Sequence, residues 1–305
     1  MKHIELTGLR ADLPIGAMAA FGCLRICQGT EAFRGAKLGW ERAGGSFAAV
    51  LSTEEARTPG ELVACLMEDV KRAPLRTELT WRARLKKLPP EEYRRAAADA
   101  ARENAEAAAW FAAFGSEAVP DSDGDIEPTP LDMTGGPQEF LAGARELAQR
   151  LSTEPEGKKG KTPERAFREA LFGPWEYTDD QHSLGWDPAT IKLGAFTYRA
   201  PTKMENAGVM AAVWLAFESL PLFPCFSGGV RGFQHTRREW TFYWPVWKAP
   251  LSVQALEYFL TLTEEDMARR GACAVYRSRR FRLNKYYAAF RTPELAWGEA
   301  LEAEA

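Results

Sequence analysis

The stretch AGVMAAVWLAFESL, residues 207–220, decides the fold, because it has the length of a helix and is apolar almost throughout. Met210, Trp214 and Phe217 recur in it at the spacing of one helix face. The segment LPLFP begins at its last residue and ends the helix, since a proline disfavours the helical conformation for the residue before it. A helix this apolar has to be buried, so we predict that it lies at the centre of the core.

The segments around this helix predict a mixture of helices and short strands. WTFYWPVW, residues 240–247, predicts an aromatic strand, and Gly44-Gly45 predicts the turn of a hairpin. The order strand, helix, hairpin, helix near the N-terminus indicates an α+β fold of mixed helices and short antiparallel sheets, with an aromatic-rich C-terminal sheet. We expect the remaining strands at residues 3–9, 38–40, 47–51, 187–198 and 272–280, and the remaining helices at residues 17–27, 61–72, 91–114, 137–151, 163–172 and 252–262.

The length of 305 residues allows one large domain or two ordinary ones. Residues 116–130 are acidic, contain prolines and have few large apolar side chains, which predicts a solvated loop. We therefore divide the chain into an N-terminal α+β region with a long alanine-rich helix (1–115), this acidic loop, and a C-terminal α+β region with a basic aromatic segment (131–305).

The C-terminal region concentrates positive charge in a chain whose net charge is -3. Residues 269–291, RRGACAVYRSRRFRLNKYYAAFR, contain no Asp or Glu. Arginines pair with phosphates and aromatic rings stack on bases, so we predict that this segment forms a single exposed surface for nucleic acid. The predicted phosphate contacts are Arg277, Arg279, Arg280, Arg282 and Lys285, with Arg231, Arg237 and Arg238 as a second cluster. Gln234 and Asn284 are side chains of the type that reads base edges.

Motifs of common enzymes are absent from the sequence, which contains no P-loop, no strand-bounded GxGxxG, no HExxH and no GxSxG. Five cysteines without a CxxC pair and three scattered histidines do not suit a tetrahedral zinc site, and we expect free thiols in a reducing cytoplasm. No signal peptide and no uninterrupted apolar run of membrane-spanning length occurs. We thus expect a cytoplasmic protein with no catalytic residue, metal, cofactor or membrane partner.

Two other classes of function remain open. Asp179, Asp180, His182 and Asp187 form a short cluster that can bind a divalent metal, as in a nuclease. Alternatively, the positive surface can meet the acidic face of another protein, as in a structural adaptor. The glycines of the segment 227–229 suit either a phosphate cradle or a plain turn.

Five motifs occur in order between residues 8 and 252. They are GLR with LPIGAMAAFGCLR (8–10 and 13–25), LDMTGGPQEFL (131–141), LGWDP (184–188), WLAFESLPLFP (214–224), and WPVW with PLS (244–247 and 250–252). Together they resemble the type I-U, or I-G, CRISPR-associated proteins that occupy the large-subunit position of a Cascade-type effector. The resemblance implies a non-catalytic subunit that helps to recognise the motif flanking the target in double-stranded DNA and to open the strands.

The same resemblance implies the partners: CRISPR backbone and RNA-processing subunits, a guide RNA, target DNA and a separate helicase-nuclease. A second basic patch can then face the guide RNA or an acidic partner. Its residues are Lys71, Arg72, Arg82, Arg84, Lys86 and Lys87.

Overall fold

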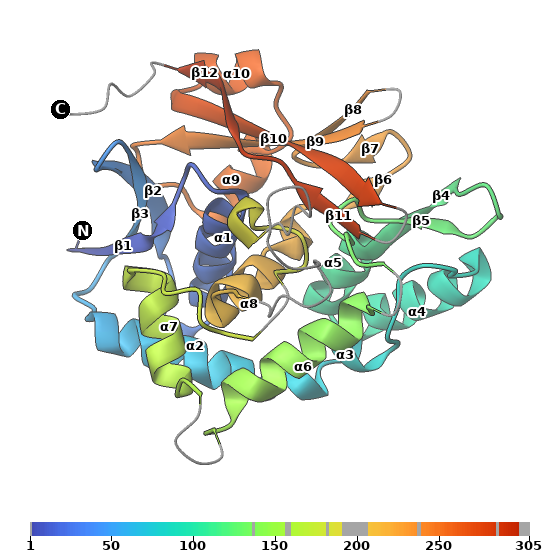
Figure 1. The fold of residues 1–305 in the computed structure, drawn as a ribbon, viewed down its shortest axis with the longest axis horizontal. Coiled ribbons are helices and arrows are strands. Elements are labelled where there is room, and N and C mark those ends of the chain that lie inside the picture. Colours follow the sequence, from blue (N-terminus) through green and yellow to red (C-terminus); the bar gives the residue numbers. More distant parts are fainter. Residues whose placement is uncertain are drawn as a thin grey trace, which may run out of the picture.

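The computed structural model describes residues 2–135, 138–155, 160–180, 183–190, 207–236, 239–284 and 287–298. It confirms the α+β class, with helices and small antiparallel sheets mixed along the chain. In Figure 1, helices α1 (Pro14–Gln28) and α8 (Met210–Glu218) occupy the centre. In this view one of the two larger sheets lies to the left of this pair and the other above it, and a layer of helices lies below.

The N-terminal sheet has the strand order β1-β3-β2, with β1 at Lys2–Arg10, β2 at Lys37–Ala43 and β3 at Ser46–Thr53. The predicted hairpin is confirmed, because β2 and β3 pair antiparallel and meet at Gly44-Gly45. Both glycines have positive φ angles, 43° and 66°, which a two-residue hairpin turn of this kind requires.

Most of the predicted helices are present with small changes at their ends. The other α-helices are α2 (Pro59–Arg72), α3 (Thr77–Thr80), α4 (Pro90–Glu103), α5 (Ala105–Phe114), α6 (Phe140–Ser152), α7 (Pro163–Phe172), α9 (Val253–Phe259) and α10 (Glu264–Arg269). Among the described residues, no helix combines the length and apolar character that crossing a bilayer requires.

Two expectations for the middle of the chain are wrong. The single helix expected over 91–114 is two helices, because Asn104 is extended (φ -171°) and its side chain accepts a hydrogen bond of 2.8 Å from Ala107 N, capping α5. The acidic loop expected over 116–130 is mostly a hairpin of β4 (Gly115–Pro120) and β5 (Ile126–Pro128). Asp121 Oδ1 organises its turn by accepting hydrogen bonds from the backbone of Asp123 and Asp125. The strand expected over 187–198 lies mainly outside the described residues.

The core is built around α1 and α8. Every residue of α8 is buried, as predicted, and in α1 only Arg25 and Gln28 are not fully buried. The two helices approach closely at Gly22, where a Cβ atom would overlap the carbonyl oxygen of Leu215. One hydrophobic cluster extends from Ile4 to Phe290, so the two regions expected on either side of residues 116–130 share one core.

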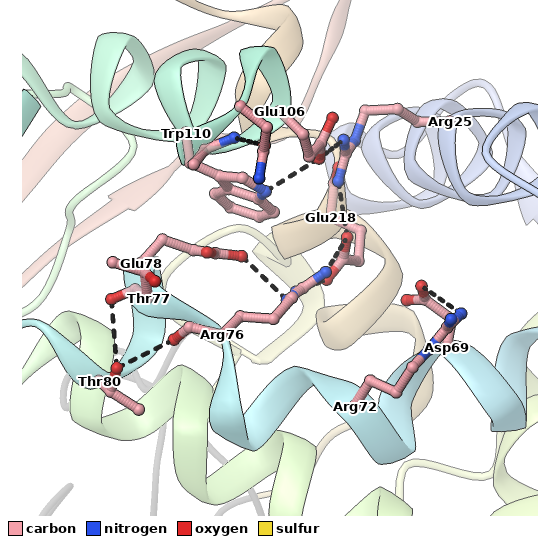
Figure 2. A network of polar contacts seen from close by, with 12 residues as sticks. Arg25, Asp69, Arg72, Arg76, Thr77, Glu78, Thr80, Glu106, Trp110 and Glu218 are labelled. Atoms are coloured by element: carbon pink, nitrogen blue, oxygen red, sulfur yellow. Dashed lines mark hydrogen bonds and ion pairs between the residues drawn. The ribbon is translucent and has the colours of Figure 1, made fainter. Parts of the chain in front are cut away.

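A buried charge network fastens this core to the helical layer (Figure 2). Glu218, at the end of α8, is fully buried. One of its carboxylate oxygens forms an ion pair with Arg25 of α1, and the other forms an ion pair with Arg76, which precedes α3. The Arg76 guanidinium lies 5.3 Å from the ring centre of Trp110 and 5.6 Å from that of Trp214. Arg76 therefore belongs to the interior, although it occurs in the cation-rich stretch 71–87.

The C-terminal sheet has the strand order β11-β10-β9-β8, and β12 also pairs with β10. Its strands are β8 (Phe233–Thr236), β9 (Glu239–Trp247), β10 (Ala272–Asn284), β11 (Tyr287–Phe290) and β12 (Glu294–Gly298). The tryptophans of β9 anchor it to the first sheet: Trp244 Nε1 donates to Ala11 O and Trp247 Nε1 donates to Leu38 O, each at 2.7 Å. Strand β10 of this sheet carries four of the eight predicted phosphate contacts, Arg277, Arg279, Arg280 and Arg282.

Candidate nucleic-acid interface

Strand β10 divides the basic segment between two faces, because successive side chains of a strand point to opposite sides. Ser278 pairs with Phe242 of β9, and both are buried against the core. We call this side of the sheet the inner face. Arg277 pairs with Tyr243 and Arg279 pairs with Thr241 on the opposite side, which we call the outer face.

The outer face presents Arg277 and Arg279 next to each other, with side chains that are 37% and 48% exposed. Glu294 of β12 contacts both, at 3.0 Å from Arg277 Nη2 and 3.5 Å from Arg279 Nη2. The hydrogen bond from Arg277 to Glu294 raises the pKa of that guanidinium. The single negative charge of Glu294 thus neutralises only part of the positive charge of Arg277 and Arg279.

Arg291 extends this group by a third cation. Its backbone N–H donates to Arg279 O at 2.9 Å, and its exposed guanidinium lies 4.9 Å from the ring centre of Phe281 on the outer face. Arg291 was not among the predicted contacts, although it is the last residue of the basic segment 269–291. We call Arg277, Arg279 and Arg291 the outer arginine row.

The expectation of a single arginine surface is wrong for Arg280 and Arg282, which occupy the inner-face positions of β10. Arg280 pairs in register with the core residue Phe290 and donates to Asp132 O at 3.2 Å. Its Nε atom is buried without a hydrogen-bond partner among the described residues, and burial lowers its pKa. Arg282 pairs with Ala288 and is exposed at the end of this face.

A pocket of 320 Å³ adjoins the outer face beside the arginine row. Arg231 lines it and contacts Glu257 at 3.7 Å, so this predicted residue lies on the same side of the sheet as Arg277 and Arg279. Gln234 also lines the pocket, and the register Gln234–Thr241–Arg279 leads from it directly to the arginine row. The aromatic part of the lining consists of Phe226, Phe233 and Tyr243.

Phe226 belongs to a small hairpin of β6 (Cys225–Phe226) and β7 (Gly229–Val230) that lines part of this pocket. The segment 227–229 is therefore the turn end of this hairpin, which favours the plain-turn interpretation over a phosphate cradle. The Phe226 side chain is 51% exposed, unusual for a large apolar residue next to so well-filled a core. On its other side lies a pocket of 200 Å³, lined in part by His235 and Trp240, whose rings stack at 4.5 Å.

Three of the predicted contacts, Arg237, Arg238 and Lys285, lie outside the described residues, and so does the side chain of Asn284. The predicted phosphate contacts that the structure describes do not all lie on one side of the sheet. Arg231, Arg277 and Arg279 share the outer side, whereas Arg280 and Arg282 do not.

The second predicted patch is distributed over separate ion pairs. Its pairs are Lys71–Glu68 (2.5 Å), Arg72–Asp69 (3.8 Å), Arg82–Glu92 (3.2 Å), Arg84–Glu139 (2.7 Å) and Lys86–Asp132 (3.8 Å). Lys87 is exposed. Because each of the five pairs engages its own carboxylate, this stretch offers a polyanion less charge than its cation count indicates.

The residues considered for a nuclease have structural roles where they are described. Asp179 is buried, accepts a hydrogen bond of 2.8 Å from Met210 N at the start of α8, and contacts Lys161 at 3.3 Å. Asp187 is buried and accepts from Ala189 N at 2.9 Å, and burial raises its pKa. Asp180 is exposed, and His182 lies outside the described residues. In the described part of the chain, no three His, Cys, Asp or Glu side chains are arranged to hold a metal.

Comparison with protein-family models, with curated proteins and with solved structures finds no match to this chain.

Proposed function

We propose that this protein is a non-catalytic nucleic-acid-binding subunit of a type I CRISPR RNA-guided surveillance complex. In this role it contributes to recognition of the motif flanking the target DNA and to opening of the strands. Two separate features support the proposal: the resemblance of five sequence motifs to large-subunit-like proteins, and the outer arginine row beside an aromatic pocket. The outer arginine row is the main observation that supports this proposal.

The spacing of the row suits a sugar-phosphate backbone. Arg277 and Arg279 are two residues apart on one strand face, so their Cα atoms are separated by roughly 6–7 Å, close to the distance between successive phosphates in an extended strand. Arg291 continues the line across the sheet from Arg279. Glu294 keeps the first two guanidiniums aligned before a polyanion arrives and is displaced or shared when phosphates bind.

In the proposed function, the pocket beside the outer arginine row binds an unpaired base. An unpaired base can stack on the exposed Phe226 ring, while Gln234 offers both a hydrogen-bond donor and an acceptor to its edge. Paired bases cannot enter such a pocket, so this arrangement favours DNA whose strands have separated. Phosphate contacts on the row and stacking in the pocket then act on one strand.

The test compares outer-face and inner-face arginines in binding to fluorescent DNA over a salt series. We expect R279A and R291A to weaken binding and to reduce the salt slope of log K by roughly 0.7–0.9 each, the contribution of one phosphate contact. The matched control is R282A, from the opposite face of the same strand, which should change neither quantity. E294Q should strengthen binding, because it frees both Arg277 and Arg279.

Equal losses in R279A and R282A would contradict the assignment to the outer face, and no DNA binding by the wild type at low salt would contradict the function. Labelled DNA with Mg²⁺ or Mn²⁺ tests the nuclease alternative, since cleavage would replace the proposal by an enzyme. Purification from cells that express a CRISPR RNA and its backbone subunits tests the assembly. Binding to a protein partner alone, free of nucleic acid, would favour the adaptor.

A further inference from the structure

The smaller pocket, of 200 Å³, lies between two hairpins and the C-terminal sheet. The hairpin of β4 and β5 contributes Ser116 and Glu127, which pair in register, and the hairpin of β6 and β7 contributes Phe226. His235 of β8 and Trp240 of β9 line the pocket from the sheet. The proposed function as stated above assigns no ligand to this pocket.

The smaller pocket adjoins the pocket of 320 Å³ beside the outer arginine row. Phe226 and Val230 line both pockets. Strand β8, the last strand in the described order of its sheet, also lines both. Gln234 lines the larger pocket and His235 lines the smaller one, because successive side chains of a strand point to opposite sides. An unpaired strand with one base in the larger pocket can therefore bring its next base to the smaller one.

The walls of the smaller pocket suit a flat ring. The rings of His235 and Trp240 stack at 4.5 Å, and Pro128 and Pro130 add apolar wall. Aromatic surfaces of this kind stack nucleobases. With 200 Å³, the pocket is smaller than the roughly 300–1,000 Å³ of pockets that hold drug-sized ligands. It therefore has the size for a single base.

Glu127 gives this pocket its chemical selectivity. The neighbouring residue Ile126 is buried and donates its N–H to Leu88 O at 2.9 Å, so the backbone beside Glu127 is held in place. Glu117 of the same hairpin pairs with Arg94, whereas in the described part of the chain no Lys or Arg pairs with Glu127. A carboxylate only accepts hydrogen bonds, so a ligand has to bring the donor.

We propose that the smaller pocket selects an unpaired base that carries an exocyclic amino group, with Glu127 accepting a hydrogen bond from that group. Cytosine, adenine and guanine have such a group, whereas thymine has a carbonyl oxygen in place of the cytosine amino group. Two acceptors would then face each other, so thymine leaves the carboxylate without a partner and is disfavoured. This inference rests on the proposed function, because it concerns the base that follows the one in the larger pocket.

The experiment measures the binding of two fluorescent single strands of equal length, one all cytosine and one all thymine. We expect the wild type to bind the cytosine strand roughly tenfold more tightly, the discrimination of one good contact to a base edge. E127Q should lose this preference, because an amide can also donate to the thymine oxygen.

E117Q is the matched control. It removes the same charge from the same hairpin, but Glu117 does not line the pocket, so the preference for cytosine should remain. The Glu127 side chain is exposed, so we expect E127Q to melt at the wild-type temperature.

The outcomes separate this inference from the function on which it rests. Binding of both strands with equal affinity by the wild type, or an unchanged preference in E127Q, would overturn the inference and leave DNA binding intact. Loss of the preference in E117Q as well would also overturn it, because the effect would then come from overall charge. If the wild type binds neither strand, the proposed function itself is wrong.

Discussion

Replacing Glu218 by Gln tests whether the buried charge network of Figure 2 maintains the fold. Glu218 is fully buried and is shared by two arginines. Arg25 Nη2 lies 2.7 Å from its Oε2, and Arg25 Nε donates to its backbone carbonyl at 2.5 Å. Arg76 contacts its Oε1 and also pairs with Glu78, at 2.9 Å, a contact that remains when Glu218 loses its charge.

The magnitude follows from the burial of the arginines. The side chains of Arg25 and Arg76 are 12% and 23% exposed, so water cannot replace the lost carboxylate. Removing one partner of a buried ion pair costs about 3–5 kcal/mol, since an uncompensated charge remains in the interior. The amide of a glutamine also turns an N–H group towards one of the two guanidiniums. For a chain of 305 residues we expect the melting temperature to fall by roughly 5–8 °C.

Urea denaturation and calorimetry measure this loss, and E106Q is the matched control. Glu106 also pairs with Arg25, but its side chain is 59% exposed, so its removal should cost less than about 1 kcal/mol. Similar losses in E218Q and E106Q, or a loss below 1 kcal/mol in E218Q, would refute the reasoning. The first result would mean that burial does not determine the strength of these pairs.

Two further changes test the same core. Burial raises the pKa of Asp69 to about 6 from 3.8. The folded state therefore holds a proton that the unfolded state has lost, and stability should fall by up to about 3 kcal/mol between pH 4 and pH 6. D69N should flatten this part of the pH–stability curve, and an unchanged slope would contradict the assignment. G22A should destabilise by at least about 2 kcal/mol in thermal melts, because its Cβ overlaps Leu215 O. G143A, whose Cβ would meet only Leu184 at ordinary contact distance, should be neutral or stabilising; equal losses would contradict the packing argument.

The sequence predicted best those elements whose signal is local. Helix α8 is apolar on all sides, so its burial followed from composition alone. Helix α7 has the predicted ends because Thr162 caps it, Pro163 starts it and Gly173 follows it. The break at Asn104 was also a local signal, since asparagine is a favoured cap, but the alanines on both sides of it favoured one continuous helix.

One feature of the candidate interface could be predicted from the sequence, and another could not. The separation of Arg279 from Arg280 follows from the strand period of two, which the predicted strand over 272–280 already implied. The role of Glu294 could not be predicted in the same way, because it depends on the pairing of β12 with β10 across 17 residues. The burial of Arg76 likewise depends on Glu218, which is 142 residues away.

In the proposed function, the outer arginine row is the part of a chain with a net charge of -3 that would bind a polyanion. Phosphate binding responds to the local field, and close to Arg279 the described outer face carries Arg277 and Arg291 together with the carboxylate of Glu294. That carboxylate lowers affinity for any anion, yet it holds both guanidiniums in place and so reduces the entropy lost when a strand binds. In the proposed complex, we expect this surface to bind DNA weakly by itself. It gains specificity when an assembly positions the strand, which is the behaviour that a subunit of a guided complex requires.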